Sequence, residues 1–254
     1  RSMNNSNIYS VHNPSKWSFS QIGNFRSFSV FAKSPFPETY FSKRFKSELK
    51  KELFGNKKIK DLLNLNTNLE ILEILPYGGQ YTNLIARQGN HKISIAEYSK
   101  NNFNYIHSRI ASQGLGRISY LNINERGNIL NKKKSFNLIY CLQSLEEYPK
   151  PNLLITEIKN ICNGDEYIVI SIRNIFSWYG IQFYLKSIRQ QVPNFGPHLP
   201  INIFKSLFYI KNNFDIIQTY GISPLPNFPG IKINFPLLKY FCRLLVVVCK
   251  KRAT

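Results

Sequence analysis

The sequence predicts an α/β protein built on a doubly wound, mostly parallel β-sheet, and three observations lead to this prediction. Apolar runs suited to buried strands recur along the chain, at residues 71–75, 92–97, 136–141 and 167–172. Segments with the helical spacing of apolar residues separate these runs. A glycine turn joins the first run to its helix. Strands that alternate with helices in this way form a parallel sheet that helices cover on both faces.

Residues 1–66 are predicted to form an N-terminal arm followed by an amphipathic helix. No sustained period is visible before about residue 37. From Glu38 onward apolar residues recur every four positions with Lys and Arg between them, and Gly55 is a natural stop. The recurring residues are Phe41, Phe45, Leu49 and Leu53. We expect this helix to pack on the domain, although its basic outer face would also suit membrane contact.

Residues 67–254 are predicted to form one domain that opens with a βαβ unit. Pro76 ends the first strand, Gly78-Gly79 supplies a tight turn, and a helix begins at Gln80. The second strand ends on a carboxylate, Glu97, about 20 residues after the glycines. This layout is typical of nucleotide binding, because the turn lets a ligand approach bare backbone and the acid can bind a ribose diol.

The following elements continue the alternation of strands and helices. Ser99 is placed to cap a helix that runs to about residue 112, and a short strand is expected at 117–121. Residues 122–135 form a polar loop. Pro151 suits the first position of the helix that precedes the strand at 167–172.

The regular alternation of strands and helices ends after this strand. Residues 173–200 are an insertion, which we interpret as a lid over the acceptor. Asn202 can cap a helix that begins at Ile203, and strands are expected at 214–222 and 244–250. No crossover helix fits between these two strands, so we expect them to pair antiparallel at the edge of the sheet.

The chain is strongly basic, with a formal net charge of +20, and the charge is uneven. Residues 171–254 contain eleven Lys and Arg but a single acid, Asp215. Such a surface suits an anionic membrane, nucleic acid or a phosphorylated substrate. The alternatives are a merely solvated basic surface and the codon bias of an AT-rich genome.

The four cysteines indicate neither a metal site nor disulfides. Their spacing shows no Cys-x-x-Cys pair and no histidine pattern typical of zinc. Cys141 and Cys249 lie in apolar runs and are predicted to be small buried hydrophobes. Free thiols and the absence of an apolar run of roughly 18 residues favour a cytoplasmic protein.

Four blocks of the sequence resemble the class I S-adenosylmethionine-dependent methyltransferases, in particular the small-molecule group that acts on quinones and sugars. They are Ile71-Leu-Glu-Ile-Leu-Pro-Tyr-Gly-Gly79, Ile95-Ala-Glu-Tyr-Ser99, Ser135-Phe-Asn-Leu-Ile-Tyr-Cys-Leu-Gln-Ser-Leu-Glu-Glu-Tyr-Pro149 and the helix, turn and strand from Leu153 to Ser171. The resemblance implies a seven-stranded Rossmann-like sheet with an antiparallel edge strand. It also implies S-adenosylmethionine as the cofactor.

The resemblance places cofactor-binding residues at the ends of three strands. They are Glu73, Pro76, Tyr77, Gly78, Gly79, Glu97, Tyr98, Asn124 and Gln143. Glu97 would bind the ribose, while Glu73 would steady the loop or hold the methionine ammonium. The loop departs from the family pattern of three alternating glycines, because Leu75 and Tyr77 fill the first two positions and only Gly79 matches. The acid expected near the adenine is also not obvious, because either Asn124 or Glu125 lies where it should fall.

Candidate acceptor residues lie in the insertion. His198 is the predicted catalytic base, because the pKa of histidine lies near working pH. Arg173 would bind an anionic acceptor, and Trp178 and Tyr179 would line an apolar pocket. A structural histidine in a proline-rich turn and a surface arginine are the plain alternatives.

These residues together predict an S-adenosylmethionine-dependent methyltransferase acting on a small or carrier-linked, anionic acceptor. A phosphorylated, sugar-linked or lipid-linked molecule would suit the basic charge. Nucleic acid is less favoured, since no Asn-Pro-Pro-Tyr-like motif is present. The alternative is a catalytically inactive methyltransferase-like protein that serves as a binding or scaffold subunit.

Overall fold

The structure is a computed structural model, and it describes much of the chain from residue 43 to residue 252. Within these limits it leaves out residues 67, 77, 116, 125, 131–134, 149, 183–184, 186–200 and 226–229.

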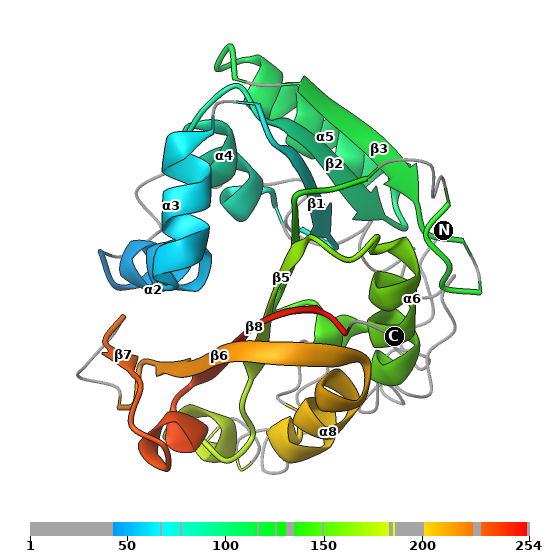
Figure 1. The fold of residues 1–254 in the computed structure, drawn as a ribbon. Helices are drawn as coiled ribbons and strands as arrows, with labels where there is room; N and C mark the ends of the chain where they lie inside the picture. The colour runs from blue at the N-terminus through cyan, green and yellow to red at the C-terminus, as the bar shows by residue number, and fades with distance from the viewer. Residues whose placement is uncertain are drawn as a thin grey trace, which may run out of the picture.

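The described residues form one eight-stranded sheet in the order β3-β2-β1-β4-β5-β8-β6-β7 (Figure 1). The strands are β1 (Glu70–Ile74), β2 (Lys92–Glu97), β3 (Arg117–Asn122), β4 (Leu138–Leu142), β5 (Tyr167–Arg173), β6 (Phe214–Ile222), β7 (Lys232–Ile233) and β8 (Leu244–Lys251). The first five strands are mutually parallel. β8 runs antiparallel to both β5 and β6, and β7 is an antiparallel edge strand.

The predicted doubly wound sheet is therefore confirmed, together with the antiparallel pairing of residues 214–222 with 244–250. The count is eight rather than seven because two residues of the connector between β6 and β8 pair with the end of β6. The four prolines of that connector gave no strand pattern, and a strand of two residues is too short to show a period.

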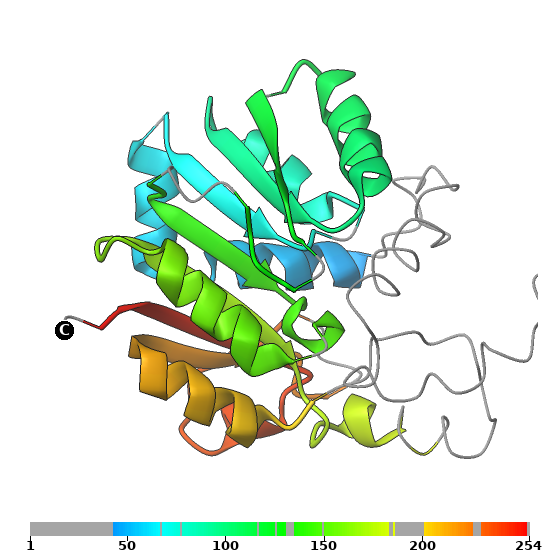
Figure 2. The same cartoon turned by 90° about the vertical axis from the view of Figure 1, so that its right-hand side faces the viewer.

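Helices cover both faces of the sheet. They are α2 (Lys43–Phe54), α3 (Lys57–Leu65), α4 (Gln80–Ala86), α5 (Lys100–Ala111), α6 (Pro151–Ile161) and α8 (Ile203–Asn213). Buried residues of α2 to α5 share one apolar cluster, and those of α6 and α8 share the other. Figure 2 shows α6 and α8 side by side in front of the sheet, with α2 and α3 behind it.

The pleat of the strands divides the core between these two layers. Along β8, Val246 and Val248 belong to the cluster on the α2–α5 side, whereas Val247 belongs to the other. Successive side chains of a strand point to opposite faces, so a strand buried on both sides must be apolar at every position. This requirement explains why the central strands are continuous apolar runs rather than alternating ones.

Three helices begin at the capping residues that local chemistry favours. The side chains of Ser99 and Asn202 accept hydrogen bonds from backbone N–H groups in the first turns of α5 and α8, as expected from the sequence. Asn56 does the same for α3, a helix that we did not predict. The predicted single N-terminal helix therefore ends at Phe54, and a second one follows directly.

Helix α2 is anchored to the sheet by buried polar contacts. The hydroxyls of Tyr140 and Tyr220 donate to the backbone carbonyls of Leu53 and Lys51. Its Glu48 carboxylate is buried, forms an ion pair with Arg243 at 2.7 Å and accepts a hydrogen bond from the Ser223 hydroxyl. These bonds connect α2 to β4, to β6 and to residues just outside β6 and β8, which are 87 to 195 positions away in the sequence.

Replacing Glu48 with alanine should lower the free energy of unfolding by about 1–3 kcal/mol, because Arg243 and Ser223 lose a buried acceptor. The matched control is Asp215→Ala, which removes an ion pair with Arg252 whose two side chains are both largely exposed. That change should cost at most about 1 kcal/mol. Urea denaturation measures both, and equal losses would contradict the anchoring role of Glu48.

Candidate functional site

The sheet has one edge at which ligands of doubly wound proteins bind, the carboxyl ends of the parallel strands. The chain order reverses between β1 and β4, which are neighbours. Loops leaving these two strands must diverge there and open a crevice. The predicted residues Glu73, Gly78, Gly79 and Gln143 all lie at or directly after the ends of β1 and β4.

Backbone strain gathers at the same edge. Among the described non-glycine residues, Leu75, Gln143 and Ser223 have positive φ values of 52°, 52° and 58°. They directly follow β1, β4 and β6, respectively. Left-handed backbone costs a residue with a Cβ roughly 1–2 kcal/mol. Strain of this kind clusters at functional sites, and it marks this edge independently of any sequence motif.

Glu73 lies buried in β1, beneath the glycine turn. Its Oε2 accepts a hydrogen bond of 2.5 Å from the Thr82 hydroxyl in α4. Its Oε1 is buried and has no hydrogen-bond partner among the described residues. Burial raises the pKa of this carboxyl to about 7. Thr82 therefore satisfies only one of the two carboxylate oxygens of Glu73.

Two residues of the turn after β1, Leu75 and Gly79, have left-handed backbone, although only one of them is glycine. Gly79 has a φ of 77°, and a Cβ there would come within 2.7 Å of the Ile106 side chain. Leu75 adopts a left-handed conformation without being glycine, and its side chain is fully buried in the core. Tyr77 lies outside the described residues.

Glu97 ends β2 and holds the start of α5. One carboxylate oxygen accepts hydrogen bonds from the backbone N–H groups of Tyr98 and Ser99, and the other accepts from the Asn102 side chain at 2.8 Å. Asn102 also reaches the carbonyl of Pro76 at 3.4 Å. Through Asn102, the predicted ribose-binding acid is thus linked to the turn after β1.

Two further predicted cofactor residues lie close to this loop. Tyr98 is half-buried, and its ring centroid lies 6.0 Å from that of Tyr148. Asn124 closes a turn of its own, because its side-chain oxygen accepts from the N–H groups of Arg126 and Asn128. The adenine-side roles of Tyr98 and Asn124 stay predictions.

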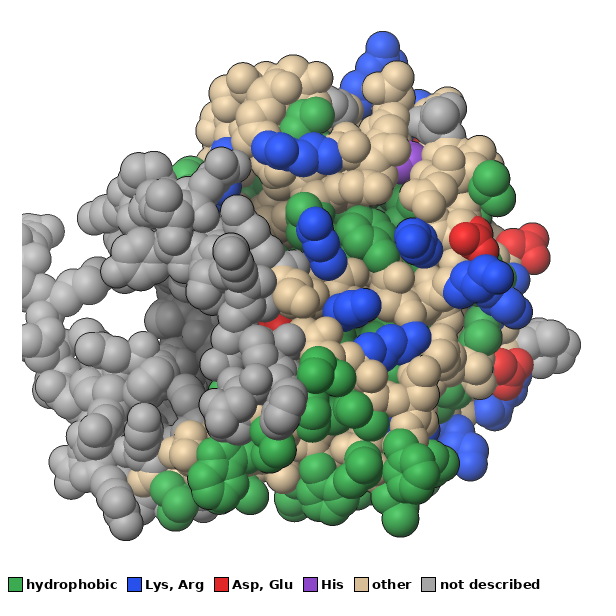
Figure 3. Space-filling model, turned by 90° about the vertical axis from the view of Figure 1, so that its left-hand side faces the viewer, with side chains coloured by type: hydrophobic (Ala, Val, Ile, Leu, Met, Phe, Trp, Pro, Cys, Tyr) green, Lys and Arg blue, Asp and Glu red, His purple; other side chains and the backbone are tan. Residues whose placement is uncertain are grey.

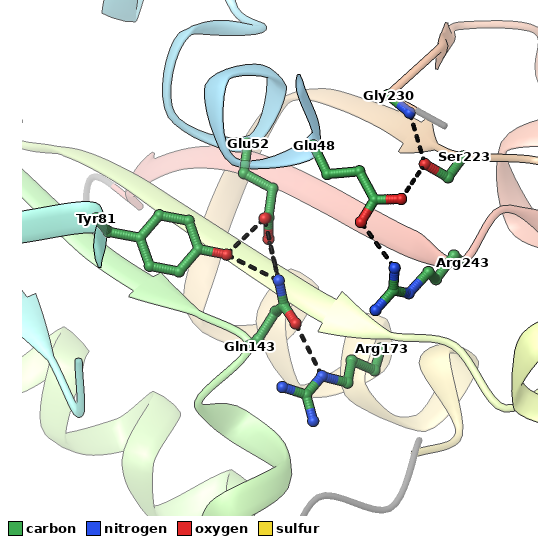
Figure 4. A network of polar contacts seen from close by, with 8 residues as sticks. All are labelled: Glu48, Glu52, Tyr81, Gln143, Arg173, Ser223, Gly230 and Arg243. Carbon is green, nitrogen blue, oxygen red and sulfur yellow. Dashed lines mark hydrogen bonds and ion pairs between the residues drawn. The ribbon is translucent and has the colours of Figure 1, made fainter. Parts of the chain in front are cut away.

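A network of polar contacts centred on Glu52 fills the crevice between α2 and the ends of β4 and β5 (Figure 4). The Glu52 carboxylate accepts hydrogen bonds from Tyr81 at 2.5 Å, Ser171 at 2.6 Å and the Gln143 amide at about 3 Å. The carbonyl oxygen of Gln143 accepts in turn from Arg173 Nε at 2.8 Å. The structure therefore joins two predicted residues, Gln143 and Arg173, through direct contact.

Burial raises the pKa of Glu52 to about 7, even though the three donors that face it oppose the shift. The pKa of Tyr81 also rises, first because of burial and then because of the Glu52 charge. A carboxyl that changes protonation near neutral pH is the property expected of an acid–base group. Here it is fully enclosed, so its immediate effect is to orient Gln143 and Tyr81.

Sequence reasoning missed Glu52. A signal was present, because Glu48 and Glu52 lie four residues apart and beside the apolar positions Leu49 and Leu53 of α2. Acids at that spacing share a face with the buried stripe. We interpreted the helix from its lysines as basic outside and did not consider which acids turn inward.

The described part of the 173–200 insertion carries the predicted acceptor residues to different places. Arg173 ends β5 and faces Gln143. Trp178 is exposed, whereas the ring of Tyr179 lies beneath the Arg243 guanidinium at 5.3 Å. The acceptor-binding roles of Arg173, Trp178 and Tyr179 stay predictions. His198 lies outside the described residues, and its catalytic role stays a prediction.

A cavity of about 830 Å³ lies apart from this site, at the junction of α2 and α3 beside β6. Four lysines contribute to its lining: Lys57, Lys58, Lys60 and Lys232. None of the predicted site residues lines it. Among the described residues, no helix is long and apolar enough to span a membrane.

No family model matches the chain, and no curated protein matches it. Solved structures do. The N-methyltransferase NodS from Bradyrhizobium japonicum WM9, in complex with S-adenosyl-L-homocysteine, matches with a TM-score of 0.60 at 9% identity, over 91% of this chain and 100% of its own. A possible histamine N-methyltransferase from Thermotoga maritima matches with a TM-score of 0.62 at 13% identity, over 90% of this chain and 100% of its own.

The [4+2]-cyclase SpnF also matches, with a TM-score of 0.59 at 13% identity, over 93% of this chain and 97% of its own. The fold is therefore that of the class I methyltransferases. At such low identity the likeness establishes the fold alone, since one fold supports many functions.

The Glu52→Gln variant should gain stability relative to the wild type as pH rises from about 5 to about 8. The folded protein holds a proton on Glu52 up to about pH 7, whereas the ordinary pKa is 4.5. The raised pKa stabilises the folded state of the wild type. This stabilisation is complete below pH 4.5 and is lost as the pH rises through about 7. Glutamine keeps the shape of the side chain without that loss.

Urea denaturation of both proteins across this range measures the difference in unfolding free energy. A difference that does not change with pH would show that Glu52 titrates normally. Because Glu73 is unchanged in both proteins, its own titration cancels from the comparison.

Proposed function

We propose that this protein is an S-adenosylmethionine-dependent methyltransferase that acts on a small or carrier-linked, anionic acceptor. One observation carries the proposal: within this fold, two buried acids, Glu73 and Glu97, flank the turn that contains Gly79. Four buried cysteines, all free thiols, are consistent with work in the reducing cytoplasm.

The described residues fit the cofactor at two points. Glu73 Oε1 is a buried acceptor with no hydrogen-bond partner among the described residues, which suits a ligand ammonium group. Gly79 gives the turn its left-handed backbone and packs directly against Ile106, where a Cβ would collide. Glu97 would accept from ribose hydroxyls in addition to, or in place of, its present donors on α5.

When bound, S-adenosylmethionine supplies a methyl group attached to a positively charged sulfur. The chain's own residues then have to orient the acceptor and exclude water. Glu52 holds Gln143, which in turn holds Arg173, and we infer that the Arg173 guanidinium binds the anionic acceptor. His198 is the proposed base for an acceptor that must lose a proton.

The second candidate is a methyltransferase-like protein without catalytic activity, which serves as a binding or scaffold subunit. The observation in its favour is Leu75, whose side chain occupies core volume at a loop position where glycine is expected. Glu97, moreover, is already supplied with donors by α5.

Titration calorimetry with S-adenosylmethionine separates these candidates, and Glu97→Gln tests the site. The variant should weaken binding by about 1–3 kcal/mol, because one ribose hydroxyl loses its charged acceptor. The matched control is Glu166→Gln, since Glu166 is also buried and also accepts from two backbone N–H groups, before the start of β5. Equal affinity in the Glu97 and Glu166 variants would remove Glu97 from the site.

The Leu75→Gly variant tests whether the loop itself limits binding. If Leu75 crowds the cofactor, glycine should strengthen binding of S-adenosylmethionine by roughly tenfold or more. It should lower stability by only about 1–3 kcal/mol, because relief of the left-handed strain partly offsets the lost core side chain. The control is Leu72→Ala, which removes a buried leucine from β1 without touching the loop. Unchanged affinity in the glycine variant would show that Leu75 does not obstruct the site.

A further inference from the structure

An apolar rim covers the surface around α8 and the segment between β7 and β8. We define it by six exposed side chains: Phe204, Phe208, Phe235, Leu237, Leu238 and Phe241. Their exposed fractions range from 55% to 69%. Figure 3 shows hydrophobic side chains gathered along the lower edge of the molecule. Exposed aromatic and leucine side chains in such number mark an interaction surface rather than ordinary scatter.

Ring contacts show that the rim is continuous between its two elements. The ring centroid of Phe204 in α8 lies 5.7 Å from that of Tyr240, which belongs to the 3₁₀ turn Leu238–Phe241. The ring centroid of Phe204 also lies 5.7 Å from that of Phe176, which follows β5. Three segments that are distant in sequence thus contribute to one surface.

The rim flanks the edge of the sheet that holds the candidate site. β8 begins at Leu244, which pairs with Arg173 at the carboxyl end of β5. The 3₁₀ turn ends three residues before Leu244, so it lies beside that same edge. A flat partner that covered the rim would therefore lie next to the mouth of the site.

The sequence segment that carries the rim is strongly basic. Residues 171–254 contain eleven Lys and Arg and one acid. Lys239 lies within the rim, 5.2 Å from the Tyr240 ring centroid, and Lys205 and Lys211 are exposed on α8. The rim thus combines aromatic, leucine and basic side chains, which is the composition of a surface that inserts shallowly into a lipid interface.

We propose that the apolar rim docks on the surface of an anionic phospholipid bilayer. A second copy of the chain is the competing occupant, because an apolar surface also suits a dimer. Dimerisation through the rim would bring together two surfaces of the same positive charge, on chains of net charge +20. Anionic lipid phosphates neutralise that charge, so charge complementarity selects the bilayer.

Docking in this orientation directs the candidate site toward the lipid. If the proposed function holds, on which this step rests, the acceptor is a lipid or a lipid-linked anion that enters from the membrane. Docking itself does not depend on catalysis, and the two are measured separately.

The test is flotation of the full chain with vesicles of equal parts phosphatidylcholine and phosphatidylglycerol. The triple variant Phe235→Ser, Leu237→Ser and Phe241→Ser should lose roughly tenfold or more in vesicle partition, because three side chains no longer enter the interface. The matched control carries Leu65→Ser, Leu130→Ser and Leu153→Ser, three exposed leucines outside the rim, and should bind as the wild type does. Wild-type binding should also weaken with added salt and fall sharply on pure phosphatidylcholine.

Thermal unfolding of both variants checks that they fold, which is expected because all six positions are exposed. Trp178, two residues after Phe176 and 51% exposed, gives a second measurement. Its fluorescence should shift to shorter wavelength on anionic vesicles, and the shift should disappear in Trp178→Phe. Equal partition of the two triple variants would overturn the proposal, as would a wild-type dimer that the rim variant converts to a monomer. Titration with S-adenosylmethionine in solution tests the proposed function without vesicles.

Discussion

The structure depends on two carboxylates that α2 carries into the protein over the carboxyl edge of the sheet. Burying a charged group is costly unless donors surround it, and a sheet covered on both faces offers such donors mainly at its strand ends. Glu52 finds them on β5 and just after β4, and Glu48 finds them on the segment around Ser223 and Arg243. Each carboxylate thereby accepts from a residue with left-handed backbone, Gln143 or Ser223. The strained strand ends and the N-terminal helix thus stabilise one another.

The turn after β1 shows how a left-handed backbone position can be filled by a residue other than glycine. A left-handed leucine costs roughly 1–2 kcal/mol in backbone energy. Full burial of its side chain stabilises the protein by about 1.5–3 kcal/mol. The burial energy is therefore slightly larger than the backbone strain. Leu75 is therefore tolerated by the core, whatever its effect on a ligand. Stability alone does not decide whether the site still binds its cofactor.

The sequence predicted those features that local periodicity and capping determine. The strand runs, the caps at Ser99 and Asn202 and the turn at Gly79 each depend on a few neighbouring residues. The Glu52 network could not be predicted in this way, because Glu52 and Ser171 are 119 positions apart and nothing local pairs them. Helix α3 was missed because it follows α2 after two residues, and Gly55 was interpreted as the end of all helical structure. Contacts between residues that are distant in the sequence can be identified only from the tertiary fold, whereas periodicity can be read from the sequence itself.

The uneven charge of the chain reflects missing acids rather than added bases. Residues 1–70, 71–170 and 171–254 contain twelve, eleven and eleven Lys and Arg, but five, eight and one Asp and Glu. A codon bias toward lysine would raise the basic count along the whole chain, and it does not explain why acids are almost absent from the last segment. That segment forms β6, β7 and β8 and the apolar rim beside the carboxyl edge. Acids on a surface that faces anionic lipid would be repelled by the lipid. Docking on such a surface therefore explains the depletion of acids in this segment, which codon bias does not explain.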